Sequence, residues 1–408
     1  MGEWLSTTLR EVANLNYGKN LPSKIRIPGD VPVYGSNGIV GWHNEAIVNK
    51  AGIIVGRKGS VGAIQLSNRP FCPIDTTYFI TADDTKVDIN FLYYLLRHFN
   101  LSRLVSDLIP GLNRDLAYAQ EIVVPNTEIE QRRIAAVLSL VQRGIEQKEH
   151  RRPRFTTGFR KVLMYKLFTE GTRGEPQKQS EIGSIPEGWE VVKLGSCCGV
   201  VNSSISYTML MKMDSFDSSK AVDVMGVKVS DMNIPGNEEA FINANLVRKL
   251  SRELSKKKTV PAGAVVFPKR GAAIATNKKR ITTTWTVLDP NLIAVVPGEK
   301  VIQGYLYYWS QTFDLRKITD PGPTPQLNKK DVVSVLFPLP QDPDEQREIT
   351  NSLKTVDKSI RGYRDQLFAM QDLFHTLLHQ LMTAEIRVND LDLEELGIKA
   401  DEEQAEAV

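Results

Sequence analysis

The last third of this chain repeats a stretch that ends near its middle, and this repeat constrains every fold that the chain can adopt. Each copy has a Pro-containing apolar run, then Glu-Gln-Arg, then a long helical pattern that closes at a Thr. Glu130 and Glu345 are 215 residues apart, whereas Leu163 and Leu377 are 214 apart. One residue is therefore gained or lost within one of the two helices.

A weaker repeat precedes the helices. The matched segments are Trp4 with Trp189, Arg57-Lys58-Gly59 with Lys269-Arg270-Gly271, Phe91-Leu-Tyr-Tyr94 with Tyr305-Leu-Tyr-Tyr308, and Leu112-Asn113-Arg114 with Leu327-Asn328-Lys329. Each half is then one large domain plus one helix. A chain of 408 residues that is 41% hydrophobic can bury two such cores.

Both long helices open with strong start signals: Thr127 with Glu130 resembles a capping box, and Asp342-Pro343 places Pro at the first helical position. Apolar residues then follow at alternating spacings of four and three, the pattern of a coiled-coil seam. The predicted seam comprises Ile134, Leu138, Val141, Ile145, Phe155, Phe159 and Leu163 in the first helix, and Ile349, Leu353, Val356, Ile360, Tyr363, Leu367, Met370, Phe374, Leu377 and Leu381 in the second. We expect two helices of roughly 40 residues, packed antiparallel on one another.

The run from Lys148 to Pro153 interrupts the first seam with positive charge and a proline. It fits either a solvated bend or a patch that faces phosphate, and the sequence leaves both open.

The net charge of +3 conceals an uneven distribution. Residues 389–408 carry −7, which leaves +10 on residues 1–388, so a basic body precedes an acidic end that we expect to be disordered. A basic body is compatible with a polyanionic partner. The sequence has no apolar run that could span a bilayer and no signal-peptide pattern, and its three cysteines form no disulfide framework, so we expect a cytoplasmic protein.

The bodies between the helices read as short strands separated by Gly, Pro and Asn. The predicted strands are 53–55, 62–66, 76–80, 264–267, 283–288 and 292–296. Arg57-Lys58 and Lys269-Arg270 each follow a buried-strand pattern, so their charges should lie where a strand reaches the surface, a placement that suits phosphate contact. The turn-rich segment from Pro32 to His43 fits either polyanion contact or a tight β-connection.

The sequence contains no P-loop, no Gly-x-Ser-x-Gly elbow, no His-Glu-x-x-His and no Cys-x-x-Cys. The (Asn/Asp)-Pro-Pro-aromatic tetrapeptide that an amino-methyltransferase needs is also missing; the nearest match is Asp320-Pro-Gly-Pro323. Asp75, Asp84 and Lys86 could form a nuclease metal site only as a chance match. We therefore expect no active site and no metal in this chain, and any catalysis in its partners.

The segment Ile182–Leu194, which reads Ile-Gly-Ser-Ile-Pro-Glu-Gly-Trp-Glu-Val-Val-Lys-Leu, resembles the entry into the second recognition domain of type I restriction–modification specificity subunits. The pattern Pro-x5-Gln-Arg before a long helix, at Pro125 and Pro340, resembles the conserved spacer regions of that family. The resemblance covers nearly the whole chain except the acidic tail.

This resemblance implies an α+β fold with two α/β target-recognition domains joined by two long antiparallel coiled-coil helices, related by a pseudo-two-fold repeat. The expected segments are target-recognition domain 1 (1–125), spacer helix 1 (126–170), a linker (171–184), target-recognition domain 2 (185–340), spacer helix 2 (341–386) and the acidic tail (387–408). It also implies a subunit that binds a bipartite, asymmetric site on double-stranded DNA. Its partners would be two adenine methyltransferase subunits and restriction/translocase subunits, which would hold S-adenosylmethionine, ATP and Mg²⁺.

Carried over by position, the resemblance assigns candidate DNA contacts to each half. For the first half-site they are Tyr34, Gly35, Ser36, Asn37, His43, Arg57, Lys58, Ser60, Asn113 and Arg114. For the second they are Lys269, Arg270, Thr276, Asn277, Lys278, Lys279, Arg280, Asn328 and Lys329. Two other functions stay open: the specificity segment of a fused restriction–methylation enzyme, and a coiled-coil adaptor that binds only protein.

Overall fold

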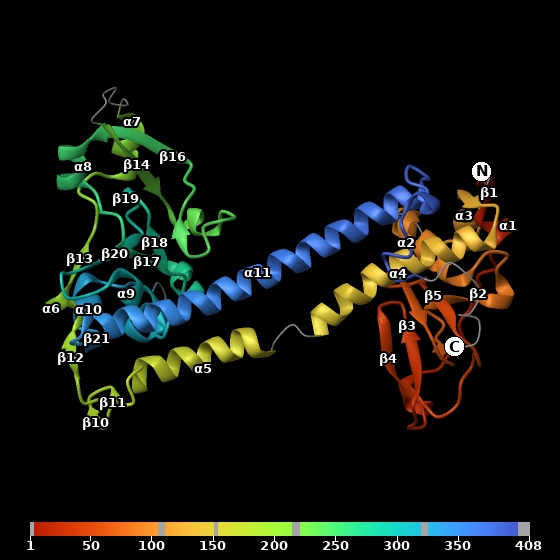
Figure 1. The fold of residues 1–408 in the computed structure, drawn as a ribbon, viewed down its shortest axis with the longest axis horizontal. Coiled ribbons are helices and arrows are strands. Elements are labelled where there is room, and N and C mark those ends of the chain that lie inside the picture. The colour runs from red at the N-terminus through yellow and green to blue at the C-terminus, as the bar shows by residue number, and fades with distance from the viewer. Residues whose placement is uncertain (1–3, 105–110, 151–153, 214–220, 320–324, 399–408) are drawn as a thin grey trace. The chain divides into compact units, whose positions relative to one another are not determined.

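The computed structural model describes residues 4–104, 111–150, 154–213, 221–319 and 325–398. The chain forms two compact units: unit 1 comprises residues 1–151 and 364–408, and unit 2 comprises residues 152–363. Each unit mixes helices and sheets, as expected for an α+β chain (Figure 1). Within the described ranges, no helix is both long and apolar enough to cross a membrane.

Unit 1 contains a four-stranded antiparallel sheet in the order β2-β8-β5-β6 and a three-stranded sheet in the order β4-β3-β7. Strands β1 and β9 form a separate antiparallel pair. The strands are β1 (Trp4–Thr8), β2 (Asn16–Tyr17), β3 (Val31–Gly35), β4 (Gly38–His43), β5 (Gly52–Gly56), β6 (Ile64–Ser67), β7 (Cys72–Pro73), β8 (Thr77–Thr81) and β9 (Glu121–Pro125). The helices are α1 (Leu9–Val12), α2 (Ile89–Phe99), α3 (Arg114–Tyr118), α4 (Glu128–His150) and the last part of α11 (Pro343–Met382).

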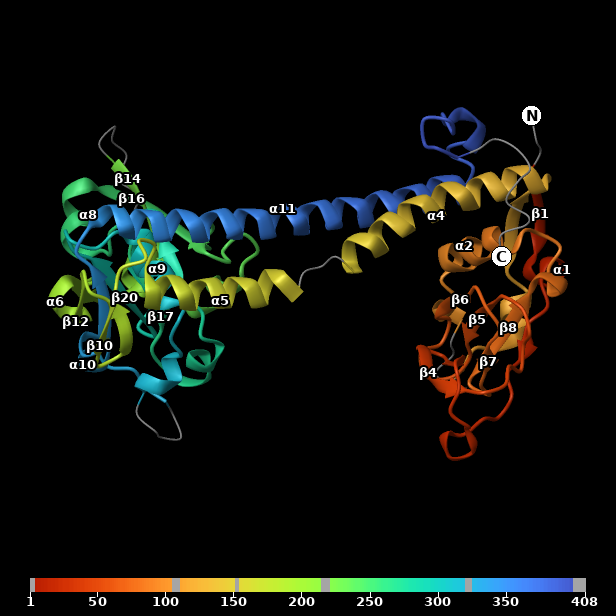
Figure 2. The same ribbon diagram turned by 60° about the horizontal axis from the view of Figure 1, so that its bottom comes forward.

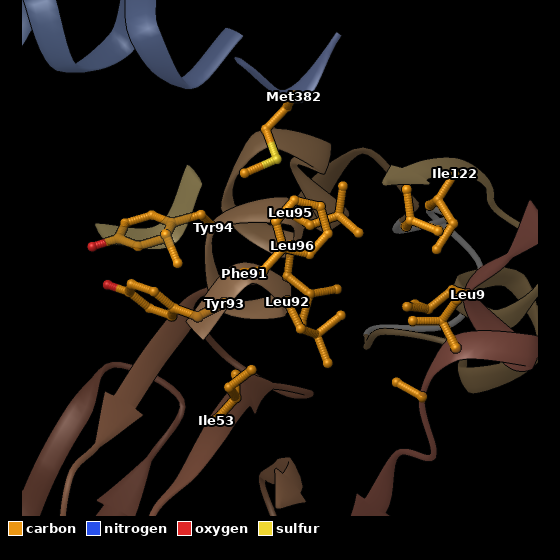
Figure 3. Close-up of a cluster of buried hydrophobic side chains, with 14 of the residues drawn as sticks. Leu9, Ile53, Phe91, Leu92, Tyr93, Tyr94, Leu95, Leu96, Ile122 and Met382 are labelled. Carbon is orange, nitrogen blue, oxygen red and sulfur yellow. The ribbon is translucent and has the colours of Figure 1, made fainter. Parts of the chain in front are cut away.

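Helix α2 forms the centre of the unit 1 core (Figure 3). The Asp88 side chain accepts a hydrogen bond from Phe91 N at 2.9 Å and caps its first turn, and Asn100 ends it in the left-handed conformation with φ of 47°. Phe91 and Leu92 are fully buried, and Met382 at the end of α11 reaches the same cluster. Each such side chain contributes about 1.5–3 kcal/mol on burial.

Unit 2 contains a five-stranded sheet in the order β13-β20-β17-β18-β15, a three-stranded sheet in the order β16-β14-β19, and two separate pairs, β12-β21 and β10-β11. The strands are β10 (Gln177–Ser180), β11 (Gly183–Pro186), β12 (Trp189–Lys193), β13 (Cys198–Val201), β14 (Ala221–Val227), β15 (Ala240–Phe241), β16 (Leu246–Ser251), β17 (Val265–Pro268), β18 (Arg280–Thr282), β19 (Trp285–Leu288), β20 (Leu292–Pro297) and β21 (Leu336–Pro340). The helices are α5 (Arg154–Glu170), α6 (Leu194–Cys197), α7 (Tyr207–Lys212), α8 (Arg252–Lys258), α9 (Gln303–Ser310), α10 (Lys329–Val333) and the first part of α11. All six predicted strand segments, three in each unit, contain observed strands.

The repeated residues make the same contacts in each unit. Trp4 Nε1 donates to Glu130 at 3.1 Å in unit 1, and Trp189 Nε1 donates to Glu345 at 2.8 Å in unit 2. Both carboxylates are buried, at 5% and 3% exposure. The Gln that follows each Glu donates to the carbonyl oxygen of the last residue of the preceding strand, Pro125 or Pro340, at 2.9 and 3.1 Å. The Trp–Glu and Gln–Pro bonds thus tie each entry strand and exit strand to a helix start.

The first spacer helix was predicted as a single element over 126–170, but the described residues form two helices, α4 and α5. In unit 1, α4 lies alongside the last part of α11 (Figures 1 and 2), and Lys148 Nζ donates to Gln366 at 2.7 Å. In unit 2, Arg160 forms an ion pair with Asp357 at 2.6 Å. Of the predicted interruption, residues 151–153 lie outside the described residues.

Along α11 all ten predicted seam positions are buried or half-buried. The four predicted positions of α4 are buried or half-buried as well, but Phe159 in α5 is 49% exposed, which corrects the expectation for that residue. The buried residues of α5 are Met164, Leu167 and Phe168. These lie 214 residues before the buried Leu378, Leu381 and Met382, and Phe159 lies 214 before the equally exposed Leu373. The predicted seam residue Leu163 is half-buried and packs on the unit 2 core beside these positions, so in α5 only Phe159 departs from the prediction among the described side chains; Phe155 is among the residues whose side chains are not described.

Two further segments differ from expectation. The predicted linker 171–184 contains most of a hairpin, β10–β11, whose second strand packs on α5. The predicted disordered tail is ordered as far as residue 398: Val388 is fully buried and Leu393 is 8% exposed, both in the unit 1 core. Arg387 donates to Glu130 at 3.2 Å. Apolar residues within the acidic run therefore anchor it, and residues 399–408 lie outside the described part.

Candidate nucleic-acid interface

In unit 1, two separate predicted motifs meet at the end of strand β5. Leu112 N donates to the carbonyl oxygen of Arg57 at 2.8 Å, which brings Arg57 next to Arg114 at the start of α3. Arg57 Nη1 also donates to the carbonyl oxygen of Asp75 at 3.0 Å. Lys58 and Ser60 are exposed beside it. The strand tip therefore presents cations from two loops at one place.

Unit 2 repeats this junction at the end of β17. Leu327 N donates to the carbonyl oxygen of Lys269 at 2.9 Å, and Arg270 bridges to Gln326 through the backbone. Burial, with the nearby charge of Arg270, lowers the pKa of Lys269. A groove lies beside this junction, lined by Val229, Arg270, Gly271, Ala273, Asn291, Pro325 and Gln326. Arg270 is the charged residue of this lining, and the other six lining residues are uncharged.

Asn113 and Asn328 act as helix caps at these junctions. The Asn113 side chain accepts from the backbone N–H groups of Asp115 and Leu116, at 2.8 and 3.3 Å. Asn328 forms a capping box with Asp331 at the start of α10. The two asparagines therefore orient the helices that begin with Arg114 and Lys329, a role that the sequence motif did not distinguish from direct DNA contact.

The segment from Tyr34 to Gly41 is a β-hairpin, the second of the two structures left open for it. Tyr34, Gly35 and Ser36 are buried, which corrects the expectation that they face DNA. Ser36 Oγ contacts the carbonyl oxygens of Lys58 and Thr76, so the turn supports the β5 tip. Asn37 remains exposed.

Exposed apolar side chains also mark this hairpin. His43 Nδ1 accepts from Ile27 N at 3.0 Å, so this nitrogen has a partner within unit 1. The exposed hydrophobic residues of β4 are Ile39, Val40 and Trp42. Arg69 lies over the Trp42 ring at 5.2 Å. The sequence reading did not select these residues as candidate contacts.

The predicted basic cluster 276–280 is largely internal. Lys279 is 1% exposed and its Nζ donates to the carbonyl oxygen of Phe313 at 2.7 Å and to Asn277 at 2.8 Å. Burial lowers the pKa of Lys279 to about 8. Arg280 is 9% exposed and donates to the carbonyl oxygen of Met232 at 2.9 Å. Both cations stabilise loops inside unit 2, which corrects their assignment to a DNA surface.

The outer members of this cluster keep part of the prediction. Thr276 is exposed and its hydroxyl donates to the carbonyl oxygen of Ala273 at 2.7 Å, and Lys278 pairs with Asn233. Asn277 adopts a left-handed conformation with φ of 54°, and its side-chain oxygen Oδ1 accepts from Lys279 Nζ and from Leu315 N. Thr276 is thus exposed, and Asn277 and Lys278 are half-buried.

Among the described residues, no group of three or more His, Cys, Asp or Glu side chains could hold a metal ion. Both units share basic residues at a strand tip, Arg57 in unit 1 and Lys269 in unit 2.

Comparison with known proteins shows what the chain is similar to. Residues 1–153 match the family model for the type I restriction modification DNA specificity domain. The chain is 25% identical over 318 residues to the putative type I restriction enzyme MjaX specificity subunit of Methanocaldococcus jannaschii, covering 74% of this chain and 69% of that protein. It is 24% identical over 366 residues to the MjaVIII specificity subunit of the same organism, covering 86% and 82%.

The S subunit of a type I restriction–modification system from M. genitalium has the same fold, with a TM-score of 0.60 at 15% identity over 93% of this chain and 96% of that one. This chain is therefore similar to type I restriction enzyme specificity subunits over most of its length, and its residues 1–153 match their DNA specificity domain. A specificity subunit carries target recognition within its system, and the family is in general non-catalytic.

Proposed function

We propose that this specificity subunit reads a bipartite, asymmetric site on double-stranded DNA, with unit 1 on one half-site and unit 2 on the other. What supports this proposal is the junction found in both units, where a Leu N–H bonds to a strand-tip carbonyl group and gathers cations from two loops. Arg57 and Arg114 come together in unit 1, and Lys269 and Lys329 come from the matching segments of unit 2. Guanidinium and ammonium groups on fixed loops suit contact with phosphates and base edges.

The two junctions have the same backbone connection but different side chains. Different side chains on one scaffold fit an asymmetric site, because each half-site then meets its own set of donors. The other sequence differences between unit 1 and unit 2 also fit recognition of an asymmetric site.

The helices would supply the remaining functions. We propose that α4, α5 and α11 set the gap between the half-sites and dock two adenine methyltransferase subunits, with restriction/translocase subunits joining that complex. In this proposal S-adenosylmethionine, ATP and Mg²⁺ are bound by those partner subunits. The repeated Trp–Glu and Gln–Pro contacts fit two equivalent docking places, since both helix starts are built alike.

The test is a gel-shift titration of the purified chain with and without its adenine methyltransferase partner. The probe carries the site identified by sequencing the methylated positions of a host that carries the system. With the partner present, we expect sequence-selective retardation of the probe. Without the partner, we expect no methylation of the probe. A protein-only adaptor would give no retardation in either case, and a fused enzyme would methylate alone.

The substitution Arg270→Ala tests whether Arg270 takes part in recognition of the second half-site. Arg270 is exposed at the edge of the unit 2 groove, so its loss should weaken binding to a probe with both half-sites intact. The loss should disappear on a probe whose second half-site is already scrambled. An equal loss on both probes would place Arg270 outside half-site recognition.

A further inference from the structure

Unit 1 carries a stacked arrangement of arginine and tyrosine side chains that the sequence reading did not identify. Arginine guanidinium groups and tyrosine rings alternate within 6 Å of each other, in contacts of 5.0 to 5.8 Å. We name this set the Arg–Tyr ladder; in contact order its members are Arg10, Tyr118, Arg114, Tyr17, Arg57 and Tyr78. They come from α1, α3, β2, the β5 tip and β8, so only the fold brings them together.

Two of the three tyrosines, Tyr118 and Tyr78, are buried and held by hydrogen bonds of their hydroxyl groups. Tyr118 is 8% exposed, and its hydroxyl accepts from Leu15 N and donates to Asn14, at 2.8 and 2.9 Å. Tyr78 is 2% exposed and donates to the carbonyl oxygen of Leu112 at 3.1 Å. Rings held in this way hold the guanidinium groups that stack on them, which lowers the entropy lost when those groups bind a ligand.

Among the residues that the structure describes, the three ladder arginines have no carboxylate partner. Within the described residues, no carboxylate oxygen lies within 4.0 Å of the guanidinium group of Arg10, Arg57 or Arg114. Two other arginines of unit 1 do have carboxylate partners: Arg132 contacts Glu128, and Arg387 contacts Glu130. The ladder therefore holds three ordered positive charges that nothing within the described part of unit 1 neutralises.

The ladder is also accessible. Tyr17, which lies between two arginines at 5.0 Å from each, is 48% exposed. Arg10 is exposed, and Arg57 and Arg114 are half-buried. A half-buried guanidinium group with free N–H groups and no counterion binds phosphate well, because its planar fork matches two phosphate oxygens.

We propose that the Arg–Tyr ladder is a clamp for the sugar–phosphate backbone of DNA, which sets the position of unit 1 on the duplex without reading its sequence. This inference rests on the proposed function and names the contact surface within it. The occupant is a nucleic-acid backbone, because the ladder continues into the β5 tip, where Lys58 and Ser60 add an ammonium group and a hydroxyl group. In unit 2 the matching Lys269 instead donates to Asn202 at 3.3 Å, so the clamp belongs to the first half-site.

The experiment uses the full chain with its methyltransferase partner and measures the dissociation constant against salt concentration. One duplex carries the site, and a second duplex of equal length has a scrambled sequence. Arg114→Gln and Arg10→Gln should each lower the slope of log K against log salt by about 1, on both duplexes alike. One phosphate contact changes the association constant K by about eightfold between 1 M and 0.1 M salt. Between these two salt concentrations, the K of each variant should therefore rise about eightfold less than that of the wild type.

Lys50→Gln is the matched control. It removes one positive charge from unit 1, but Lys50 is already paired with Asp83, so its slope should stay close to that of the wild type. Tyr17→Leu should weaken binding on both duplexes, since it removes the ring that lies between Arg57 and Arg114. Circular dichroism of each variant separates these effects from misfolding.

The outcomes separate the two proposals. If the wild-type complex binds neither duplex, the proposed function fails. If it binds but the arginine variants keep its slope, only the clamp is wrong. A loss confined to the site-bearing duplex would make these residues base readers, and loss of methyltransferase binding without a change in DNA affinity would make the ladder a protein interface; either result overturns the clamp.

Discussion

At the scale of single residues, Lys279 gives a pH-dependent prediction. Burial lowers its pKa from 10.5 to about 8, so between these values the unfolded chain binds more protons than the folded chain. Below pH 8 the buried charge of Lys279 therefore lowers the free energy of unfolding by its full amount. This destabilisation disappears as the pH rises from 8 towards 10.5. The largest cost is about 3 kcal/mol, from about 1.36 kcal/mol for each pKa unit.

Lys279→Met should remove this dependence. Phe313 O keeps a donor in Asn277 Nδ2, and Asn277 Oδ1 keeps Leu315 N, so the substitution leaves neither acceptor unpaired. We expect the variant to be at least as stable as the wild type at pH 7 in urea denaturation, with the difference shrinking as the pH rises to 10.5. DNA affinity should not change. A difference that is independent of pH would contradict the assignment.

Residue positions show where sequence reasoning succeeds and where it stops. The exposed cations at the strand tips were predicted because a buried apolar run followed by Arg-Lys or Lys-Arg has few other readings. Lys279 and Arg280 look equally basic in sequence, but their partners Phe313 and Met232 are distant in the chain. The Arg–Tyr ladder was missed for the same reason, since its residues share no local motif.

At the scale of elements, α11 allows a matched pair of substitutions on one helix. Leu353 is fully buried in the unit 2 core, whereas Phe368 is 71% exposed. Leu353→Ala should lower the free energy of unfolding by about 2–5 kcal/mol, through lost burial and a cavity. Phe368→Ala should change it by less than about 0.5 kcal/mol. Urea denaturation measures both, and equal effects would mean that the buried face of α11 is wrongly placed.

The long helices were the most predictable elements, because caps and a seam of alternating fours and threes are local signals. The buried face of α5 was not predictable from the buried face of α4, because residues 151–153 lie between the two helices. The hairpin β10–β11 also escaped prediction: Gln177–Ser180 is polar and lacks the alternation that marks a strand. Its place is set by packing on α5, a tertiary contact.

At the scale of the whole molecule, the proposed gap between half-sites depends on helix length. Residues 364–370 of α11 and 144–150 of α4 contain mutual contacts: Lys148 donates to Gln366, and Gly144 approaches Met370. Deleting both segments together removes one heptad from each side and keeps the seam in phase. The deletion shortens the helices by about 10 Å, or about three base pairs at 3.4 Å each.

We expect the double deletion to shift the preferred gap by about three base pairs, or to abolish assembly with the methyltransferase. Methylation of a duplex library with varied gap lengths measures the shift. Deleting residues 364–368 alone is the control, because five residues turn the rest of α11 by about 140° and bring the wrong face to α4. That variant should lose assembly at every gap length. A double deletion that assembles and keeps the original gap would show that the helices do not set the spacing. That result would not bear on whether each unit recognises its half-site.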